Sequence, residues 1–366
     1  MRAALLAAQG QPLEIVDDIV IRDPRPGEVK VRVRHCGICH SDLTIADGAF
    51  PTGLPLVLGH EAAGVVEEVG EGVTTHAPGD QVVLTPCPPC GSCYWCIRGE
   101  WSLCVNSTGL LTNTFPDGST GLSRGDEMVF RGLNVAGFAE YTVTQANGAI
   151  KIPDEVPLEL ACVIGCAVQT GVGAVLNTAK VVEGATVLVL GLGGIGLSVV
   201  QGARLASAAQ IIVSDPVPER REAAKLFGAT HQLDPGSDDI VEAARDLTDG
   251  IGVDYAFETA GFASLVETGY NAARNGGTII AVGAPPVDQS ITLAPATLLT
   301  VSGKKLMGCL LGSCNSLLEI PRLVSLWQAG RLDLEALITG RRPLAEINEA
   351  MGDLRASRGI RTVLDI

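Results

Sequence analysis

The sequence predicts an α/β protein of two domains, a β-rich domain followed by a doubly wound parallel sheet. Short apolar runs separated by Pro and Gly fill the first part of the chain, and a strand, a glycine-rich turn and a helix follow one another from residue 185. Five cysteines between residues 87 and 104 predict a metal-bound loop inside the first domain. A chain of 366 residues is long enough to bury two hydrophobic cores.

The composition limits the kinds of molecule that the protein is expected to bind. The formal net charge is −15, so phosphate groups would be repelled over most of the surface, and we expect no nucleic-acid and no membrane partner. A membrane-spanning helix needs about 20 mainly apolar residues. The most apolar stretch, residues 160–176, is interrupted by Gln169 and Thr170, and the apolar run at the start of the chain breaks at Gln9, so neither a span nor a signal peptide is expected.

The β-rich domain is predicted from four apolar runs with little helical periodicity. They are VKVRVRHC (29–36), AAGVVEEVG (62–70), QVVLT (81–85) and AEYTVT (139–144). Pro and Gly turns separate them, which is typical of short antiparallel strands.

The cysteine-rich loop predicts a zinc site. Tetrahedral zinc binds four soft ligands at about 2.3 Å, and Cys-x-x-Cys turns bring paired sulfurs to one point. A disulfide knot is the alternative, but it belongs to small secreted chains, whereas a reducing cytoplasm keeps such thiols free for metal. We therefore expect a cytoplasmic protein. Spacing alone leaves open which four cysteines bind among Cys87, Cys90, Cys93, Cys96 and Cys104.

A dinucleotide site is predicted where the apolar run ATVLVL (185–190) reaches GLGGIG and passes into a helix. The first glycine permits the turn, the second lets the backbone approach a pyrophosphate, and the third allows close packing of helix on strand. The helix N-terminus offers free amides to the anion. The predicted cofactor-binding residues of this turn are Gly191, Gly193, Gly194, Ile195 and Gly196.

Asp215 ends the next apolar run, IIVSD, about 20 residues beyond the turn, where a carboxylate accepts hydrogen bonds from the adenosine ribose. Its charge favours NAD over NADP, although Arg220 and Arg221 are close enough in sequence to soften the exclusion of a 2′-phosphate. Arg220 is counted among the cofactor-binding residues. A strand-end aspartate that caps the next helix is the alternative for Asp215.

The rest of the chain first continues the alternation of strands and helices, and its last segment no longer follows this pattern. We predict a helix over 218–227, a strand over 253–258, a helix after Gly261 and a strand over 277–282. Beyond residue 310 two amphipathic helices, 317–330 and 344–357, precede the strand 362–366. This segment is too short for a core of its own, so it should return to the first domain.

Three further segments of the first domain carry possible metal ligands: HCGICHSD from His35, GHE from Gly59 and GCAVQTGVGA around Cys166. Singly, each has an ordinary explanation, because a buried cysteine is usually inert packing and a lone histidine is usually a hydrogen-bonded core residue.

Together, GICHSD, LGHEAAG, CGSCYWC, GCAVQTG and GLGGIG resemble the zinc-containing medium-chain alcohol dehydrogenase family in order and spacing over nearly the whole chain. The resemblance implies a GroES-like catalytic domain over 1–168 with the structural zinc loop at 87–104, an NAD-binding Rossmann domain over 169–309, and a return to the catalytic domain over 310–366.

The resemblance also implies the cofactors, which are NAD and two Zn²⁺ ions per subunit. Cys39, His60 and Cys166 would hold a catalytic zinc whose fourth position stays open, a ligand set known for alcohol dehydrogenases. The family spacing Cys-x2-Cys-x2-Cys-x7-Cys selects four residues for a structural zinc and leaves Cys87 outside. These four are Cys90, Cys93, Cys96 and Cys104.

The implied reaction is reversible hydride transfer between NAD and a primary alcohol or aldehyde, with zinc as a Lewis acid. Asp42 would orient the ligand histidine, Ser41 would hydrogen-bond the alcohol, and Glu61 would act electrostatically or as a transient ligand. Thr44 stands where many relatives carry a relay histidine, so the proton exit is left open. His40 and Arg361 match positions that contact the cofactor pyrophosphate.

The long stretch between Cys104 and Tyr141 looks like that of dimeric relatives, so we expect a homodimer, with a tetramer as the alternative. Medium-chain or aromatic alcohols are the expected substrates, because Phe50, Pro86, Leu110 and Leu111 suggest an apolar pocket wall. Glutathione-dependent formaldehyde dehydrogenase is the nearest alternative, although the acidic and arginine residues with which that branch holds the glutathionyl carboxylates are replaced near Phe50 and Gly121. A non-catalytic nucleotide-binding scaffold is the alternative of another class.

Overall fold

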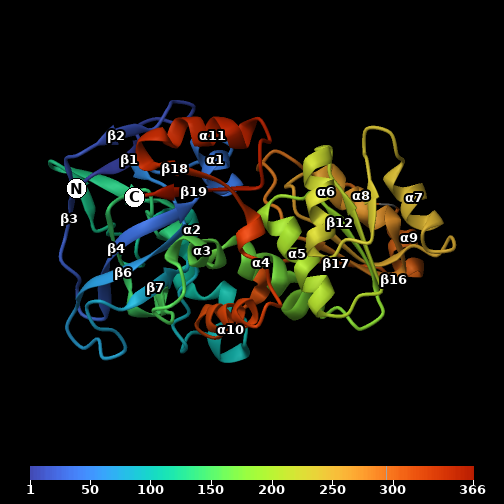
Figure 1. The fold of residues 1–366 in the computed structure, drawn as a ribbon, viewed down its shortest axis with the longest axis horizontal. Helices are drawn as coiled ribbons and strands as arrows, with labels where there is room; N and C mark the ends of the chain where they lie inside the picture. The colour runs from blue at the N-terminus through green and yellow to red at the C-terminus, as the bar shows by residue number, and fades with distance from the viewer. Residues whose placement is uncertain (294) are drawn as a thin grey trace. The chain divides into compact units, whose positions relative to one another are not determined.

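The computed structural model describes residues 1–293 and 295–366. By its internal contacts the chain divides into two compact units (Figure 1). The first unit consists of Met1–Gln169 and Cys314–Ile366, and the second of Thr170–Ser313. Each unit has its own sheets and its own apolar core.

The main sheet of the first unit has seven strands in the order β11-β7-β6-β4-β19-β18, with β10 also paired to β4. All of its pairs are antiparallel except β18 with β19. The strands are β4 (Glu28–Gly37), β6 (Glu61–Val69), β7 (Gln81–Leu84), β10 (Tyr141–Gln145), β11 (Ala149–Lys151), β18 (Ile338–Pro343) and β19 (Arg361–Asp365). The four apolar runs predicted in this region are therefore all strands.

A second sheet of this unit runs in the order β2-β1-β5-β9-β8-β3. Its strands are β1 (Ala3–Leu6), β2 (Glu14–Val16), β3 (Ile19–Ile21), β5 (Leu56–Val57), β8 (Leu122–Arg124) and β9 (Glu127–Arg131). Six α-helices begin in the unit: α1 (His40–Ala46), α2 (Gly109–Thr112), α3 (Leu158–Ala161), α4 (Ala167–Gly173), α10 (Ser316–Gln328) and α11 (Ile347–Arg355). The C-terminal strand β19 lies antiparallel to β4, so the end of the chain is built into this sheet.

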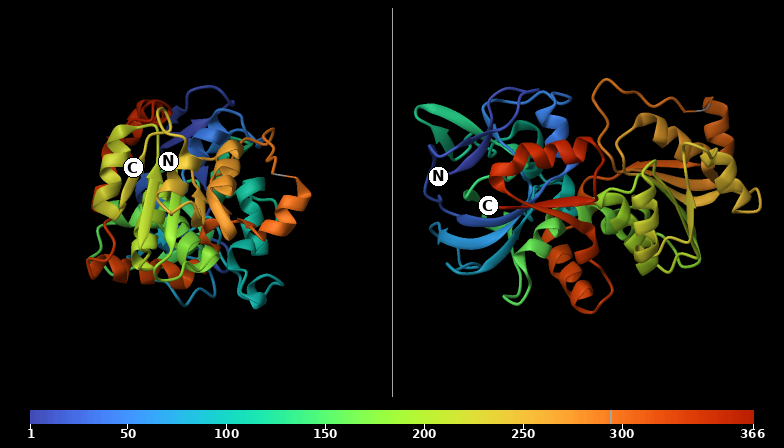
Figure 2. Two further views of the ribbon diagram at one scale, coloured as in Figure 1. Left: turned by 90° about the vertical axis from the view of Figure 1, so that its right-hand side faces the viewer. Right: turned by 45° about the horizontal axis from the view of Figure 1, so that its top comes forward.

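The second unit is a parallel sheet in the order β14-β13-β12-β15-β16-β17. The strands are β12 (Thr186–Leu190), β13 (Gln210–Ser214), β14 (His231–Leu233), β15 (Val253–Glu258), β16 (Ala273–Ala281) and β17 (Lys305–Gly308). Its helices are α5 (Gly194–Leu205), α6 (Pro218–Phe227), α7 (Ile240–Asp246), α8 (Ala263–Ala272) and α9 (Ala296–Ser302). Helices cover both faces of the sheet (Figures 1 and 2), and the predicted doubly wound architecture is confirmed.

Among the described residues, no single helix is both long and apolar enough to cross a membrane. One bent pair, Leu158–Gly165 with Ala167–Ala179, meets the criteria of length and composition only when its two parts are taken together.

Candidate functional site

Three segments of the first unit bring possible metal ligands to one buried point. Cys39 is the N-cap of α1, His60 directly precedes β6, and Cys166 lies between the 3-10 helix Cys162–Gly165 and α4. Their ligand atoms, together with a carboxylate oxygen of Glu61, all lie within 4.8 Å of one another. All four residues are buried. The segments are far apart in sequence, so only the folded sheet brings them together.

Two glycines make room for this cluster. Gly59 has φ +91°, and a Cβ there would lie 2.6 Å from the backbone nitrogen of Phe138, so the sharp turn that presents His60 requires glycine. A Cβ on Gly37 would collide with the Glu61 carboxylate. Gly37, at the end of β4, therefore leaves the space that the Glu61 side chain fills.

Asp42 connects two of the ligand segments. Its Oδ1 lies 3.1 Å from Nδ1 of His60 and accepts a hydrogen bond from the Gly59 amide at 3.0 Å. Its Oδ2 accepts a hydrogen bond from the Cys39 amide at 3.1 Å. The Nδ1 contact leaves Nε2 of His60 as the ring nitrogen that is free to bind a metal.

Proton affinities differ among the ligands of the cluster. The hydrogen bond from the Cys166 thiol lowers the pKa of Cys39 well below its usual value, and the same contact raises the pKa of Cys166. Burial opposes the charged form of His60, but the Asp42 carboxylate raises the His60 pKa. Two soft sulfurs and one imidazole, buried and oriented, fit a zinc ion. Cys39, His60 and Cys166 are the residues that could hold it.

Glu61 and Arg361 lie beside these ligands. Burial raises the pKa of Glu61 to about 7, while the Arg361 guanidinium opposes this shift. Nε of Arg361 is 3.5 Å from Oε2 of Glu61, and Nη1 donates to the carbonyl of Ile38 at 2.5 Å. The side chain of Arg361 is only 5% exposed. Arg361 was predicted to contact the cofactor pyrophosphate, and within the first unit it packs against Glu61.

The residues predicted for proton transfer and cofactor contact lie on α1. The Ser41 hydroxyl is 3.8 Å from Sγ of Cys39 and so lies next to the cluster. Thr44 donates its hydroxyl to the carbonyl of His40 at 2.8 Å, within the same helix. The Thr44 proton is therefore engaged by the backbone, and only its oxygen is left to accept. His40 is exposed at the start of the helix.

Replacing Asp42 with asparagine is expected to lower zinc affinity and turnover by about 10- to 100-fold, because the negative charge beside His60 is lost and an NH2 group must face one of the donors that the two carboxylate oxygens now accept from. Zinc content after dialysis against a graded chelator series measures the affinity, and steady-state kinetics measures the turnover. The matched control is Asp47→Asn, which changes an exposed carboxylate paired with Arg355 just beyond the same helix. Equal zinc retention by Asp42→Asn and wild type would contradict the orienting role.

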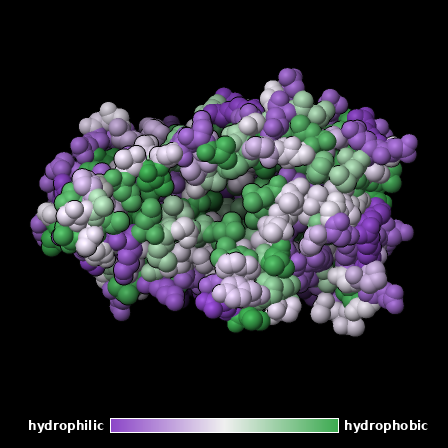
Figure 3. Space-filling model, turned by 180° about the vertical axis from the view of Figure 1, so that it is seen from behind, coloured by the Kyte–Doolittle hydropathy of each residue, from purple (hydrophilic) through white to green (hydrophobic). Residues whose placement is uncertain are grey.

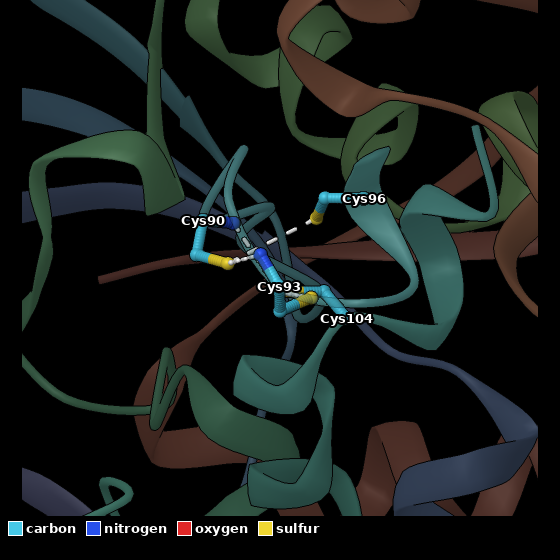
Figure 4. Close-up of side chains that lie close together, drawn as sticks. All are labelled: Cys90, Cys93, Cys96 and Cys104. Carbon is cyan, nitrogen blue, oxygen red and sulfur yellow. Dashed lines mark hydrogen bonds between the residues drawn. The ribbon is translucent and has the colours of Figure 1, made fainter. Parts of the chain in front are cut away.

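The cysteine-rich loop forms a second ligand group (Figure 4). The ligand atoms of Cys90, Cys93, Cys96 and Cys104 lie within 4.8 Å of one another, and Cys87 is not a member of the group. Backbone amides of Cys96 and Val105 lower the pKa of Cys93 to about 6.

Two more backbone amides donate to sulfur in this loop, from Cys93 to Sγ of Cys90 at 3.3 Å and from Cys90 to Sγ of Cys104 at 3.2 Å. Such hydrogen bonds favour thiolates, so these four residues fit a closed zinc site. Burial raises the pKa of Cys87 to about 12 and that of Cys104 to about 12 as well, so Cys87 differs from the group by its position and not by its pKa.

The glycine turn of the second unit has the shape that a dinucleotide needs. Gly191 has φ +95°, and a Cβ there would lie 2.8 Å from Cβ of Ala260. A Cβ on Gly196 would collide with the carbonyl oxygen of Gly191. A Cβ on Gly193, the N-cap of α5, would meet nothing within 4 Å, so the backbone there is open to a ligand. Gly194 and Ile195 begin the helix whose amides face the same end.

Asp215 directly follows β13, and its carboxylate is hydrogen-bonded to the glycine turn. Its Oδ2 accepts from the Leu192 amide at 2.7 Å, and its Oδ1 accepts from the Val217 amide at 2.8 Å. Arg221 donates to the Asp215 carbonyl at 2.6 Å and forms an ion pair with Asp234 at 2.7 Å. The charge of Arg221 is thus already compensated, which weakens its ability to attract a 2′-phosphate. Arg220 is buried on α6.

Two residues at the end of β15 escaped the sequence reasoning. Glu258 is buried, and the hydroxyl of Thr259 donates to the carbonyls of Leu190 and Gly191, which belong to the glycine turn. The sequence does hold one sign of their importance, because the apolar run VDYAFE ends in an acidic residue.

Comparisons with known proteins agree with both units. The family described as "Alcohol dehydrogenase GroES-like domain" matches residues 25–154, and the family "Zinc-binding dehydrogenase" matches residues 194–328. A protein of Escherichia coli O1:K1 / APEC named S-(hydroxymethyl)glutathione dehydrogenase is 40% identical, with 99% of each chain covered.

Solved structures are similar over the same length. Benzyl alcohol dehydrogenase from Acinetobacter calcoaceticus is 33% identical with a TM-score of 0.93, and the match covers 100% of this chain and 99% of that one. An alcohol dehydrogenase zinc-binding domain protein from Burkholderia ambifaria is 38% identical with a TM-score of 0.94, covering 100% and 98%. The chain therefore belongs to the zinc-containing medium-chain alcohol dehydrogenase family.

Proposed function

We propose that this protein oxidises primary medium-chain or aromatic alcohols with NAD and reduces the corresponding aldehydes. The observation that carries the proposal is the buried cluster of Cys39, His60 and Cys166, with Asp42 fixing the imidazole. A nucleotide-binding scaffold would have no use for an oriented ligand set of this kind, so the cluster favours an enzyme.

In this proposal Cys39, His60 and Cys166 hold one zinc ion, and the glycine turn with Asp215 holds NAD. When bound, zinc supplies a Lewis acid that favours loss of the alcohol proton, and NAD supplies the hydride acceptor. Ser41 binds the substrate hydroxyl and receives its proton, since its hydroxyl lies next to Cys39. Thr44 has no pKa near 7, and its proton is bound to the His40 carbonyl, so water is the proposed final acceptor.

A glutathione adduct is the second candidate substrate, because a relative at 40% identity is named for that activity. The basic side chain nearest to Gly121 is Arg22, whose Nε would lie 3.5 Å from a Cβ at this glycine. The guanidinium of Arg22 is already bonded through both terminal nitrogens to Glu28, at 2.5 and 2.8 Å. It is therefore not free to bind a glutathione carboxylate, and we favour a simple alcohol.

The apolar residues expected around the substrate divide into two groups. Phe50 and Leu110 are half-buried and pack against the core of the first unit, and Pro86 is buried. Leu111 is 78% exposed and does not belong to such a wall. It follows Leu110 directly in α2, and neighbouring helix residues point about 100° apart, so Leu110 can pack against the core while Leu111 faces solvent.

The proposal is tested with a panel of primary alcohols, with S-(hydroxymethyl)glutathione and with either NAD or NADP, on zinc-replete protein. We expect NADH formation with benzyl or medium-chain alcohols, at a kcat/KM at least about tenfold higher than with the glutathione adduct. Higher kcat/KM with the adduct would select the second candidate. No reduction of either nucleotide with any substrate would leave the scaffold as the function.

We further propose that two copies of the chain associate through β17, the edge strand of the parallel sheet. All four of its residues are exposed, including Leu306 at 40% and Met307 at 37%. Unpaired strand edges with apolar side chains readily pair with another chain. The space-filling view of one face shows that apolar patches lie among hydrophilic surface elsewhere in the molecule too, so exposure of β17 alone does not single it out, and its unpaired edge is what the proposal uses (Figure 3).

We propose the cytoplasm as the location of the protein. The cysteines proposed as zinc ligands are free thiols, and a reducing compartment preserves free thiols.

The association is tested by light scattering on the purified protein, where the mass of a dimer is expected. Leu306→Lys should shift the mass to that of a monomer, because a buried unpaired lysine at an interface is costly. The control is Leu226→Lys on α6, a leucine that is 69% exposed and lies away from the strand edge. A tetramer for wild type would indicate a second interface, and an unchanged mass for Leu306→Lys would refute the role of β17.

A further inference from the structure

A buried carboxylate stands at the centre of the carboxyl edge of the parallel sheet. Glu258 is the last residue of β15 and is 1% exposed. In the sheet it lies between Leu190, the last residue of β12, and Ala281, the last residue of β16. Ligands of open parallel sheets bind at this edge, beyond the ends of the strands. The residues so far assigned to the cofactor do not include this side chain.

The carboxylate of Glu258 organises the loop that follows it. Oε1 accepts hydrogen bonds from the amides of Ala260 at 2.8 Å, Gly261 at 2.6 Å and Phe262 at 3.2 Å. Oε2 is buried and accepts no hydrogen bond from the described residues. Burial raises the pKa of Glu258, and the loop amides act against this shift. An oxygen that receives three N–H groups holds the loop backbone in one conformation.

This loop is the support of the glycine turn. The Thr259 hydroxyl donates to the carbonyl of Leu190 at 3.1 Å and to that of Gly191 at 2.8 Å. The Thr259 amide donates to Leu190 as well, at 3.0 Å. Ala260 fills the space beside Gly191, where a Cβ would approach to 2.8 Å. A displacement of residues 259–261 would therefore be passed directly to the turn.

The far side of the turn is held in a similar way. The Gly191 amide donates to the Ser214 carbonyl at 2.9 Å, and the Leu192 amide donates to Asp215. The turn is thus fixed by β13 on one side and by the loop after β15 on the other. A buried carboxylate takes part on each side, Asp215 on the first and Glu258 on the second.

We propose that Glu258 is a positioning residue, which holds residues 259–261 so that the glycine turn keeps the shape that receives a dinucleotide. This inference rests on the proposed function, because it concerns the same NAD site. Glu258 touches no predicted ligand atom; it acts on the cofactor through Thr259 and Ala260. Its removal should weaken cofactor binding and leave the hydride-transfer step unchanged once the cofactor is bound.

Glu258→Gln is the informative change, since it preserves volume. The carboxamide oxygen keeps an acceptor, but the charge is lost and an NH2 group takes the place of a buried oxygen that has no hydrogen-bond partner. Charge-assisted hydrogen bonds are roughly twice as strong as neutral ones, so we expect the Kd for NADH to rise by about tenfold or more. The kcat at saturating NAD should stay within about threefold of wild type.

The matched control is Asp254→Asn, at the other end of the same strand. Asp254 also accepts a backbone amide, from Thr186 at 2.8 Å, and it pairs with Arg274 at 2.7 Å. This variant should lower the melting temperature and leave the Kd for NADH within twofold. A fluorescence titration with NADH measures the Kd. A twofold or smaller change for Glu258→Gln, or a fall in kcat at unchanged Kd, would overturn the proposal.

A second readout works without cofactor. Hydrogen exchange of the peptide 185–197 in the cofactor-free protein should be faster in Glu258→Gln than in wild type and unchanged in Asp254→Asn. Faster exchange in a protein that binds neither NADH nor NADPH would support the positioning role and refute the proposed cofactor. Unchanged exchange would refute the positioning role alone. If Glu258→Gln does not fold, Thr259→Val should reproduce the weaker binding and Thr259→Ser, which keeps the hydroxyl, should restore it.

Discussion

Cys166→Ser is expected to lose one of the two zinc ions per subunit and to reduce alcohol oxidation by at least about a thousandfold. A neutral hydroxyl is a poor zinc ligand beside Cys39 and His60, and a bound metal contributes several kcal/mol to the stabilisation of the reacting oxygen. A loss of about 4 kcal/mol corresponds to this fall in rate. Elemental analysis measures the metal, and NADH formation measures the rate.

Cys162→Ser provides the control for this substitution. Cys162 is also a buried thiol of the first unit, four residues earlier in the chain, but it is not a member of the ligand cluster. The control should keep both zinc ions and most of the activity. Full zinc content and unaltered turnover in Cys166→Ser would remove Cys166 from the site.

Cys96→Ser is expected to lose the other zinc ion and to lower the melting temperature by at least about 10 °C. Structural zinc sites contribute about 10–16 kcal/mol of binding free energy in small zinc domains, and this energy is coupled to folding. Cys96 is one of the two buried members of the group, with Cys104, and its Sγ lies 4.0 Å from that of Cys90. Calorimetry of matched zinc-replete samples measures the shift.

Cys87→Ser tests which cysteines form the second site. Cys87 precedes Cys90 at the same two-residue spacing, yet it lies outside the group, so this variant should retain both zinc ions and the melting temperature of wild type within a few degrees. Cys104→Ser should instead behave like Cys96→Ser. The reverse pattern would place the structural zinc in the register from Cys87 to Cys96.

The ligand set Cys39, His60 and Cys166 was predicted through the family resemblance that several short motifs carry together by their order and spacing. GICHSD forms the start of a helix with Cys39 at the N-cap, and GHE forms a turn that only glycine permits. The glycine turn at residue 191 was predicted from its own residues, because GLGGIG follows an apolar run and begins a helix. The contacts that hold these segments come from distant parts of the chain, from Phe138 beside Gly59 and from Ser214 and Thr259 beside Gly191.

Contacts between distant segments were less accessible. Arg361 was assigned to the pyrophosphate through the resemblance, and this assignment stays a prediction. The contact of its guanidinium with Glu61 was not predicted, because it depends on the pairing of β19 with β4, more than 300 residues away. The loop held by Glu258 depends on which strands flank β15, and strand order is not written in the residues of β15 itself. Leu111 was grouped with Leu110 by hydrophobicity alone, but its side chain in α2 is exposed to solvent.

The contacts of Asp42 also bear on how the metal enters. One carboxylate holds the Cys39 amide, the Gly59 amide and the His60 ring, so two ligand segments are fastened together by protein atoms alone. The entropy of gathering these ligands is lost when the chain folds, and none of it remains to be lost upon metallation. Ion uptake by the folded apoprotein should therefore be governed by diffusion and by the release of thiol protons, without a rearrangement of the backbone.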